Sequence, residues 1–577
     1  MRVTLVFPPA LCLPNQIYFA LPLLAGALRR AGHMPAIVDL NARAADMLLD
    51  EERATRIVDA FRDSEARSRS SPGDGSDLDD HVRSVASRLA PGEAAKHLLR
   101  DPRRFYVPEL ARDAFWTVVD VLAGFYQLDL VLTPYDERFA EFMLANQRAD
   151  RWSTLRELWD EGLADAVLAS RPDLVGICVA YSEQSIESVR LARRIRARDP
   201  GVHIAFGGPL ITRFPERWLD GDWLLEFADT VILGDGDSAL VELCDALEGK
   251  RPLESVRNSV RRDAAGRRRD PAQVDRCESL DDWPTPDFSV ADMTLYLQPD
   301  PIHTLITSRG CYWGRCAMCS IVGQDPFQME SRAKLRSDVR AIAAAGGRFL
   351  QLQDTSVPPK TARWLAEIVL EDGLDLHWAG WMKFESCFKD RAFCELLAAG
   401  GCRSLHMGYE SNDQRLLDLM RKGYRHADLL GMLRNLREAG ISTELLWFIG
   451  FPTQTRADVI DSARFLWQHR DQFGLASFVG DFGLHPDCEV HRDPLAFGVT
   501  NVRHRDGKWR YDVSAGLSMD EAAQLKAMFA GDNNRTLTGN GIHLLHLVRN
   551  GLDLSRLARP MNIPAALLAD SSPPPSG

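Results

Sequence analysis

The chain has 577 residues, of which 45% are hydrophobic and 26% charged, a composition typical of globular proteins. This length exceeds what one hydrophobic core usually supports, so it predicts two or three domains. The net charge of −12 argues against a nucleic-acid partner, which usually requires a basic surface. No apolar stretch approaches the ~18 residues that span a bilayer, and the N-terminus lacks the pattern of a signal peptide. We therefore expect a cytoplasmic protein without a membrane or nucleic-acid partner, in which the eleven cysteines are reduced.

The first 250 residues alternate short apolar runs with helical patterns, which predicts parallel strands joined by helices. The expected strands are Val3–Phe7, Ala36–Leu40, Leu174–Val179, His203–Phe206 and Val231–Leu233. The expected helices are Leu21–Ala31, Ser185–Arg198 and Ala239–Leu247. Residues 1–250 thus read as an α/β domain with a Rossmann-like, doubly wound parallel sheet. Such sheets bind ligands at the carboxyl ends of their strands.

Two segments depart from this alternation. Residues 45 to about 168 show helical patterns and no convincing strand, so we expect a helical insertion with a loop at Pro72–Ser76. Residues 251–300 are rich in proline, which predicts a linker. The basic run Arg261–Arg269 within it reads as a solvated turn rather than a binding patch, because like charges repel and stay hydrated.

A second α/β series occupies residues 301–483. Its expected strands are Ile302–Thr307, Phe349–Gln353, Leu376–Met382, Ser404–Gly408, Glu444–Ile449 and Ser477–Asp481. Six β–α units of this size predict a partial (β/α)6 barrel of the TIM type, whose catalytic face is the carboxyl end of the strands. Residues 484–577 have mixed patterning, and we expect them to shape the substrate pocket and to end in a disordered tail at residues 571–577.

Three cysteines, Cys311, Cys316 and Cys319, follow the first strand of the predicted barrel within nine residues. Three thiolates so close together can hold one metal centre. A structural zinc site is one reading, but zinc takes four closed ligands and no nearby residue supplies the fourth. A [4Fe–4S] cluster is normally held by four cysteines. With three, one iron stays open to a substrate or cofactor.

This arrangement resembles the radical S-adenosylmethionine (SAM) superfamily, in which the open iron binds SAM and reductive cleavage gives a 5′-deoxyadenosyl radical. The spacing here is CxxxxCxxC, one residue longer than the usual CxxxCxxC. The resemblance implies SAM-binding residues at the ends of later strands: Asp354, Thr355, Lys383, Glu410, Ser411, Ile449 and Gly450. Each has an ordinary reading when taken singly, such as an exposed carboxylate for Glu410 or a turn for Gly450. Their order along one barrel face favours the functional reading.

The N-terminal domain, placed before such a barrel, resembles the cobalamin-binding subclass of these enzymes. The resemblance implies a cobalamin site at the strand ends, with contacts from Pro8, Ser182, Glu183, Gly207, Gly208, Pro209, Gly234, Asp235 and Gly236. A plain Rossmann-like scaffold or a nucleotide site is the alternative reading of these glycines. The domain contains no Asp-x-His-x-x-Gly sequence, so we expect no histidine ligand to cobalt. Tyr181, Ser182, Glu183 and Gln184 are candidates, by position, for the side chain below the metal.

The resemblance implies a cobalamin-dependent radical SAM enzyme with three cofactors: a [4Fe–4S] cluster, SAM and cobalamin. The expected activity is methyl transfer to an unactivated carbon of a natural-product or peptide substrate. A rearrangement, ring contraction or cyclisation without methyl transfer is the alternative, because it needs the same sites. A non-catalytic electron or cobalamin carrier is a third reading, which the SAM-like positions disfavour. An external electron donor of the flavodoxin or ferredoxin type is implied, and the sequence does not identify catalytic residues.

Overall fold

The computed structural model describes residues 1–68, 82–128, 138–148, 153–276, 279–321, 325–505, 508–530 and 542–550. The predicted loop at 72–76 and the predicted disordered tail at 571–577 lie outside these residues. The chain forms two compact units, Met1–Pro301 and Ile302–Gly577. Within the described residues, no helix is both long enough and apolar enough to cross a membrane.

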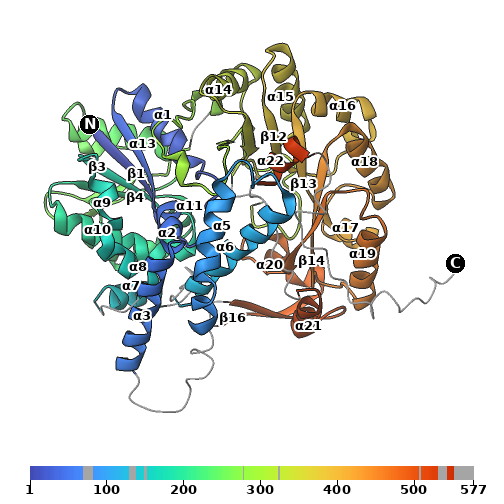
Figure 1. Cartoon of the computed structure of the whole chain (residues 1–577), viewed down its shortest axis with the longest axis horizontal. Coiled ribbons are helices and arrows are strands. Elements are labelled where there is room, and N and C mark those ends of the chain that lie inside the picture. The colour runs from blue at the N-terminus through green and yellow to red at the C-terminus, as the bar shows by residue number, and fades with distance from the viewer. Residues whose placement is uncertain are drawn as a thin grey trace. The chain divides into compact units, whose positions relative to one another are not determined.

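The first unit is built on a seven-stranded sheet in the order β2-β1-β3-β4-β5-β6-β7 (Figure 1). Its parallel strands are β1 (Arg2–Phe7), β2 (Met34–Asp39), β3 (Leu174–Cys178), β4 (His203–Gly207) and β5 (Thr230–Ile232). The helices between them are α1 (Ala20–Arg30), α10 (Ser185–Arg198), α11 (Pro209–Arg213), α12 (Pro215–Trp218) and α13 (Gly236–Leu247). All five predicted strands and three predicted helices are confirmed, and the sheet is doubly wound. Alternating buried strands and amphipathic helices produce this fold because each parallel connection needs a crossover.

The order of the strands places a topological switch point between β1 and β3. From β1 the chain crosses to β2 on one side, and later returns to β3 on the other side of β1. The connection from β1 to β2 and the connection from β3 to β4 leave the carboxyl ends of β1 and β3 in opposite directions, so a crevice lies between these two strand ends. Ligands of open α/β sheets bind in such crevices.

The described residues between β2 and β3 form helices and no strand, as predicted. They are α2 (Leu40–Leu48), α3 (Glu51–Ser68), α5 (Leu89–Arg100), α6 (Pro108–Leu128), α7 (Phe139–Arg148), α8 (Thr154–Leu158) and α9 (Asp165–Leu168). Helices α5 and α6 each carry an apolar face, and the two helices pack against each other.

The segment predicted as a linker contains a hairpin that extends the first sheet. Strand β6 (Ser259–Arg262) pairs antiparallel with β5, and β7 (Arg268–Arg269) pairs with β6. The predicted solvated turn is therefore only the tip of the hairpin. There the Asp263 carboxylate accepts hydrogen bonds from the backbone N–H groups of Ala265 and Arg267. Arg261 is buried in the strand, because long arginine stems pack well on apolar surface. Composition alone did not indicate this burial.

The second unit is built on six parallel strands in the order β15-β14-β13-β12-β11-β8, the arrangement of a partial barrel. The strands are β8 (Ile302–Leu305), β11 (Phe349–Leu352), β12 (His377–Met382), β13 (Cys402–Glu410), β14 (Ser442–Ile449) and β15 (Leu475–Asp481). Helices α14 (Arg332–Ala344), α15 (Pro359–Glu371), α16 (Arg391–Ala399), α17 (Gln414–Leu419), α18 (His426–Ala439) and α19 (Arg456–Gln468) connect them. All six predicted strands are confirmed, and Figure 1 shows the helices arranged around their outer side.

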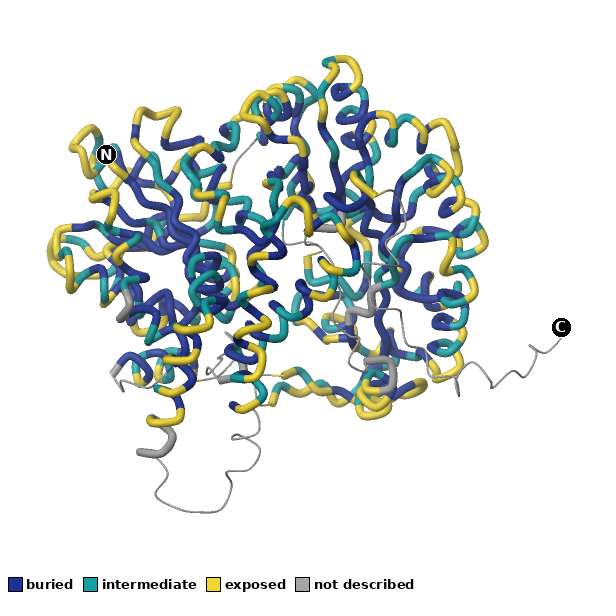
Figure 2. The backbone as a smooth tube through the Cα atoms, viewed as in Figure 1, coloured by how far each residue is buried: buried dark blue, intermediate teal, exposed yellow. Residues whose placement is uncertain are grey.

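The C-terminal part of the second unit begins with α20 (Glu489–Arg492) and an antiparallel hairpin of β16 (Val499–Arg505) and β17 (Lys508–Val513). Helices α21 (Met519–Ala530) and α22 (Ile542–Asn550) follow, and α22 packs against β12 and β13. A short antiparallel pair, β9 (Ser308–Arg309) and β10 (Gln328–Met329), brackets the cysteine loop. In each unit the parallel strands are mostly buried and the outer faces of the helices are exposed, while the β16–β17 hairpin is largely exposed (Figure 2).

Candidate functional site

The three cysteines lie where the sequence places them, in the loop after β8. Cys311, Cys316 and Cys319 are partly exposed free thiols, and the backbone N–H of Cys319 donates to the carbonyl of Cys316 (3.2 Å). Burial raises the pKa of Cys316 to about 11. The nearby Lys422 ammonium lowers this pKa, whereas the other two thiols raise it further. The three sulfurs therefore belong to one electrostatic environment. A donor set of three thiols fits an iron–sulfur cluster with one open iron.

The end of the cysteine loop is anchored to the C-terminal segment. Ala317 is buried, its N–H donates to the carbonyl of Met420 (3.0 Å), and its carbonyl accepts from the N–H of Val490 (3.2 Å). Met318 packs on an apolar cluster that includes Phe451 and residues beyond 483. A methionine before the last cysteine is thus a packing residue, suited to an irregular apolar surface by its flexibility.

Glu410 is the last residue of β13 and has the strongest geometric signature in the second unit. Its φ is +60°, a conformation that is uncommon for a residue other than glycine, and it lies at a register shift after Gly408. The side chain is 8% exposed, and one oxygen accepts a hydrogen bond from the Lys422 ammonium (2.8 Å). The other oxygen accepts none from the described part of the chain. A strained, buried carboxylate with one oxygen unused is suited to accept hydroxyl donors from a ligand.

Lys422 is the cationic partner of this carboxylate. Its burial alone would lower the pKa of the ammonium, but Glu410 and the thiols of Cys316 and Cys319 outweigh that effect and the pKa is raised. Gly408 leaves room for the pair, since a Cβ there would lie 2.2 Å from Oε1 of Glu410. The ion pair therefore connects the end of β13 to the turn after α17, where the ammonium also interacts electrostatically with Cys316 and Cys319.

Asp354, after β11, is buried and holds the start of the cysteine loop. Its carboxylate accepts hydrogen bonds from the N–H (3.2 Å) and hydroxyl (2.8 Å) of Thr307 and from the hydroxyl of Ser308. Burial raises its pKa despite these bonds. The neighbouring Thr355 is exposed. In this structure Asp354 therefore joins two strand ends, a role the sequence did not indicate.

Lys383 and Ser411, both predicted to bind SAM, are buried and engaged within the protein. The Lys383 ammonium donates to the carbonyl of Phe384 (3.0 Å) and to Glu385 (2.9 Å), and lies 4.2 Å from the centre of the Trp313 ring. The Ser411 hydroxyl accepts from the N–H of Asp413 (3.1 Å), at the start of α17.

Ile449 and Gly450 end β14 with a defined backbone turn. Gly450 has φ +83°, and its N–H donates to the Gln454 side chain (2.7 Å), while the Ile449 carbonyl accepts from the N–H of Phe482. A Cβ at Gly450 would lie 2.9 Å from Cβ of Ala522 in α21. The turn therefore needs glycine both for its conformation and for the approach of α21.

In the first unit, Pro8 and residues 180–184 meet at the switch point. Gln184 is fully buried and joins them: its amide donates to the carbonyl of Pro8 (2.7 Å) and accepts from the N–H groups of Ala180 (2.7 Å) and Tyr181 (3.0 Å). Ser182 donates to Glu183 (3.1 Å). Tyr181 is 46% exposed, and its ring contacts those of Phe7 and Tyr18 edge-on. The crevice thus presents the aromatic side chain of Tyr181, whose backbone is held by the buried Gln184 side chain.

The glycines after β4 and β5 are required by the packing of the chain itself. Gly208 has φ +110°, and a Cβ there would lie 2.4 Å from the carbonyl oxygen of Val179. Gly234 has φ +69° and faces the Val274 side chain. Both glycines admit close approach by the chain itself. Gly207 carries the carbonyl that accepts from the N–H of Val179 (2.8 Å), and Pro209 and Gly236 begin α11 and α13, with Asp235 immediately before α13.

No imidazole of the sheet lies at this carboxyl edge. His203 is the first residue of β4, and His33 precedes β2, so both lie at the amino ends of the strands. The donor chemistry at the switch point therefore fits a cobalamin that receives no histidine from the strands of this sheet.

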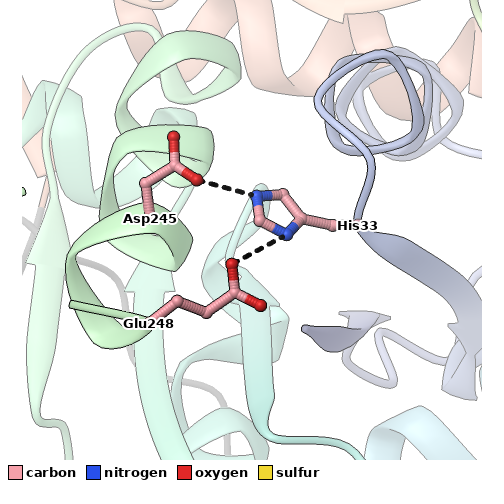
Figure 3. A group of neighbouring side chains, drawn as sticks. All are labelled: His33, Asp245 and Glu248. Carbon is pink, nitrogen blue, oxygen red and sulfur yellow. Dashed lines mark ion pairs between the residues drawn. The ribbon is translucent and has the colours of Figure 1, made fainter. Parts of the chain in front are cut away.

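His33 belongs to a separate group with Asp245 and Glu248, drawn in Figure 3. Its Nε2 lies 3.6 Å from the Asp245 carboxylate. The carboxylates, however, already have cationic partners, since Lys250 lies 2.6 Å from Glu248 and 3.1 Å from Asp245. The Met1 ammonium lies 2.8 Å from Glu248. This group is charge-balanced, and we do not assign it a metal.

Sequence reasoning missed the role of Trp313, whose indole contacts Arg421 and Lys383. These residues lie far from it in the sequence, and a single sequence carries no signal of such contacts.

Comparison with known proteins agrees with this geometry. Residues 144–244 match the B12 binding domain model, and residues 305–466 match the radical SAM superfamily model. An uncharacterized methyltransferase, PH0819, of Pyrococcus horikoshii is 25% identical over 304 residues, which is 51% of this chain and 64% of that protein. The chain thus matches less than two thirds of that relative's length. Cytidylyl-2-hydroxyethylphosphonate methyltransferase of Streptomyces wedmorensis is 22% identical over 65% of this chain and 78% of that protein.

Among solved structures, the cobalamin-dependent SAM radical enzyme OxsB with aqua-cobalamin bound superposes with a TM-score of 0.56. It is 13% identical, and the superposition covers 95% of this chain and 71% of that one, which shows a shared fold. The fold and the site define a two-unit α/β enzyme with a thiol-rich barrel mouth. The chain therefore contains a B12-binding domain at residues 144–244 and a radical SAM domain at residues 305–466, and these two domains imply a [4Fe–4S] cluster, SAM and cobalamin as cofactors.

Proposed function

We propose that this enzyme is a C-methyltransferase that acts on an unactivated carbon of a natural product or peptide. The observation that carries the proposal is the presence in one chain of a B12-binding domain and a radical SAM barrel whose cysteine loop lies beside the buried Glu410–Lys422 pair. The methyltransferase names of two relatives support methyl transfer over rearrangement.

When bound, the cluster and SAM supply a 5′-deoxyadenosyl radical, and cobalamin carries the methyl group. The proposed work of the chain's own residues is to bind and orient. Cys311, Cys316 and Cys319 hold the cluster. Glu410 accepts the ribose hydroxyls of SAM through the oxygen that Lys422 leaves unused. Charged hydrogen bonds of this kind contribute ~1.5–3 kcal/mol each.

The remaining predicted SAM-binding positions support the site in different ways. Asp354 holds the start of the cysteine loop, and Ser411 fixes the chain after Glu410. Ile449 and Gly450 present a backbone edge at the end of β14. Thr355 is exposed and can contact ligand directly. For Lys383 the engaged ammonium favours support of the loop over direct contact with SAM.

In the first unit, we propose that cobalamin occupies the switch point between β1 and β3. Pro8, Ser182 and Glu183 lie at this crevice, and the turns Gly207–Pro209 and Gly234–Gly236 lie at the ends of the next two strands. We further propose an external flavodoxin- or ferredoxin-type electron donor, and a substrate pocket shaped partly by residues 484–577.

The test uses the reconstituted enzyme, SAM with a deuterated methyl group, and candidate compounds made by neighbouring genes. The expected result is a product that gains one methyl group carrying the label, in a reaction that needs both cobalamin and reductant. A product of rearranged skeleton without the label would reject methyl transfer and retain the radical SAM assignment.

A further inference from the structure

The spacer between Cys311 and Cys316 contains two aromatic residues that attach it to different parts of the barrel. The Tyr312 hydroxyl donates to Glu385 (3.0 Å), in the loop after β12. The Trp313 indole N–H donates to the carbonyl of Arg421 (2.8 Å), in the turn after α17. The spacer therefore bridges the ends of two strand–helix units.

The Trp313 ring lies against Gly423. A Cβ at Gly423 would lie 2.2 Å from Cζ2 and 2.3 Å from Cη2 of the indole, closer than carbon atoms can approach. Gly423 also has φ +73°, and Gly314, the next residue of the spacer, has φ +56°. Gly314 and Gly423 thus permit the indole to lie against the turn that contains Gly423.

The indole also receives cations. The Lys383 ammonium lies 4.2 Å from the ring centre and the Arg315 guanidinium 5.2 Å. Glu385 forms an ion pair with Lys383 (2.9 Å) and accepts a hydrogen bond from Tyr312, so the ammonium is held between the ring and this carboxylate. A cation over an indole face is stabilised by the ring quadrupole.

We propose that Trp313 is the positioning residue that accommodates the additional residue of the CxxxxCxxC spacer. By lying against Gly423 it fixes the path from Cys311 to Cys316, and its ring keeps the Lys383 charge beside the cluster. Nearby charge and hydrogen bonding help to set the reduction potential of such clusters. The inference rests on the proposed function only in requiring that the cluster bind.

The experiment is a double-mutant cycle on the full chain, read out by iron content and by the midpoint potential of the cluster. Gly423→Ala should lower iron per chain at least fivefold, because the new methyl group collides with the indole. Gly346→Ala is the matched control, because Gly346 has φ +85° and nothing within 4 Å of an added Cβ. It should keep parental iron.

Trp313→Leu removes the ring, so adding Gly423→Ala to it should cost far less iron than Gly423→Ala costs in the parent. Trp313→Leu alone should make the midpoint potential of the cluster more negative, because the Lys383 ammonium loses the aromatic ring that holds it near the cluster. Trp313→Phe retains an aromatic face, and its midpoint potential should stay near that of the parent. Equal iron in Gly423→Ala and Gly346→Ala, or a potential unchanged in Trp313→Leu, would overturn the inference. A parent chain that binds no iron would instead refute the proposed function.

Discussion

Both parallel sheets end one strand in a buried carboxylate, and the two carboxylates differ in their partners. Asp39 ends β2 of the first sheet, and Glu410 ends β13 of the second, each 8% exposed. Asp39 accepts hydrogen bonds from neutral groups, the N–H of Ala42 (2.9 Å) and the hydroxyl of Tyr296 (2.9 Å). Glu410 accepts from the Lys422 ammonium.

The difference separates a structural carboxylate from the carboxylate proposed to bind SAM. Burial raises the pKa of Asp39 to about 6, and its bonds cap α2 and hold Tyr296, so it is a structural residue. Glu410 has a cation beside it and a backbone conformation that costs free energy, as expected of a ligand-binding carboxylate. More generally, the second sheet presents charged groups at its carboxyl end, whereas the first presents glycines and aromatic rings on a backbone fixed by Gln184.

The largest expected effect tests the charged end. Replacing Cys311, Cys316 and Cys319 with alanine should abolish iron binding, because these three partly exposed thiols are the proposed protein ligands of the cluster. Iron and sulfide analysis of anaerobically reconstituted protein measures this. Retention of the iron and of its absorption spectrum by the triple variant would place the cluster elsewhere.

The next effect tests the close-packed end of the first sheet. Gly208→Ala should destabilise the first unit by ~3 kcal/mol or more, since the methyl group would lie 2.4 Å from the Val179 carbonyl oxygen at an unfavourable φ. Chemical denaturation and cobalamin retention report it. Gly221→Ala, with φ +61° and open space around the Cβ, is the control. Similar losses in the two variants would show that backbone strain alone is responsible.

Glu410→Gln should weaken SAM binding or slow SAM cleavage roughly tenfold or more, because a charged acceptor is lost. The cluster should still assemble, and calorimetry with SAM measures the affinity. If the variant binds and cleaves SAM as the parent does, Glu410 is not a SAM ligand and the comparison with Asp39 fails.

The smallest effect concerns Asp39 and depends on pH. Its folded pKa of about 6 exceeds the ordinary value of 3.8, so between these values the folded state holds a proton that the unfolded state has released. Stability therefore falls as the pH rises through this window. Asp39→Asn should remove that loss, so its stability relative to the parent should be greater at pH 7 than at pH 4. Denaturation curves at the two pH values test it; an equal difference at both would exclude titration of Asp39 as its cause.

The fold was largely predictable from sequence because the parallel strands of both sheets are short apolar runs bounded by turn residues. The strands Ser259–Arg262 and Arg268–Arg269 escaped prediction, because arginine-rich edge strands lack the apolar pattern of buried ones. The cysteine positions follow from spacing alone. The anchoring roles of Asp354 and Lys383 could not be predicted, since their partners Ser308 and Trp313 lie far from them in the sequence.

The proposed function requires one enzyme to use SAM in two ways, as methyl donor and as radical source. The most direct measurement quantifies S-adenosylhomocysteine and 5′-deoxyadenosine formed by the reduced, cobalamin-loaded enzyme. The account predicts both products, with 5′-deoxyadenosine lost in Cys311→Ala and S-adenosylhomocysteine lost when cobalamin is omitted. Formation of 5′-deoxyadenosine without any cobalamin-dependent S-adenosylhomocysteine would contradict it.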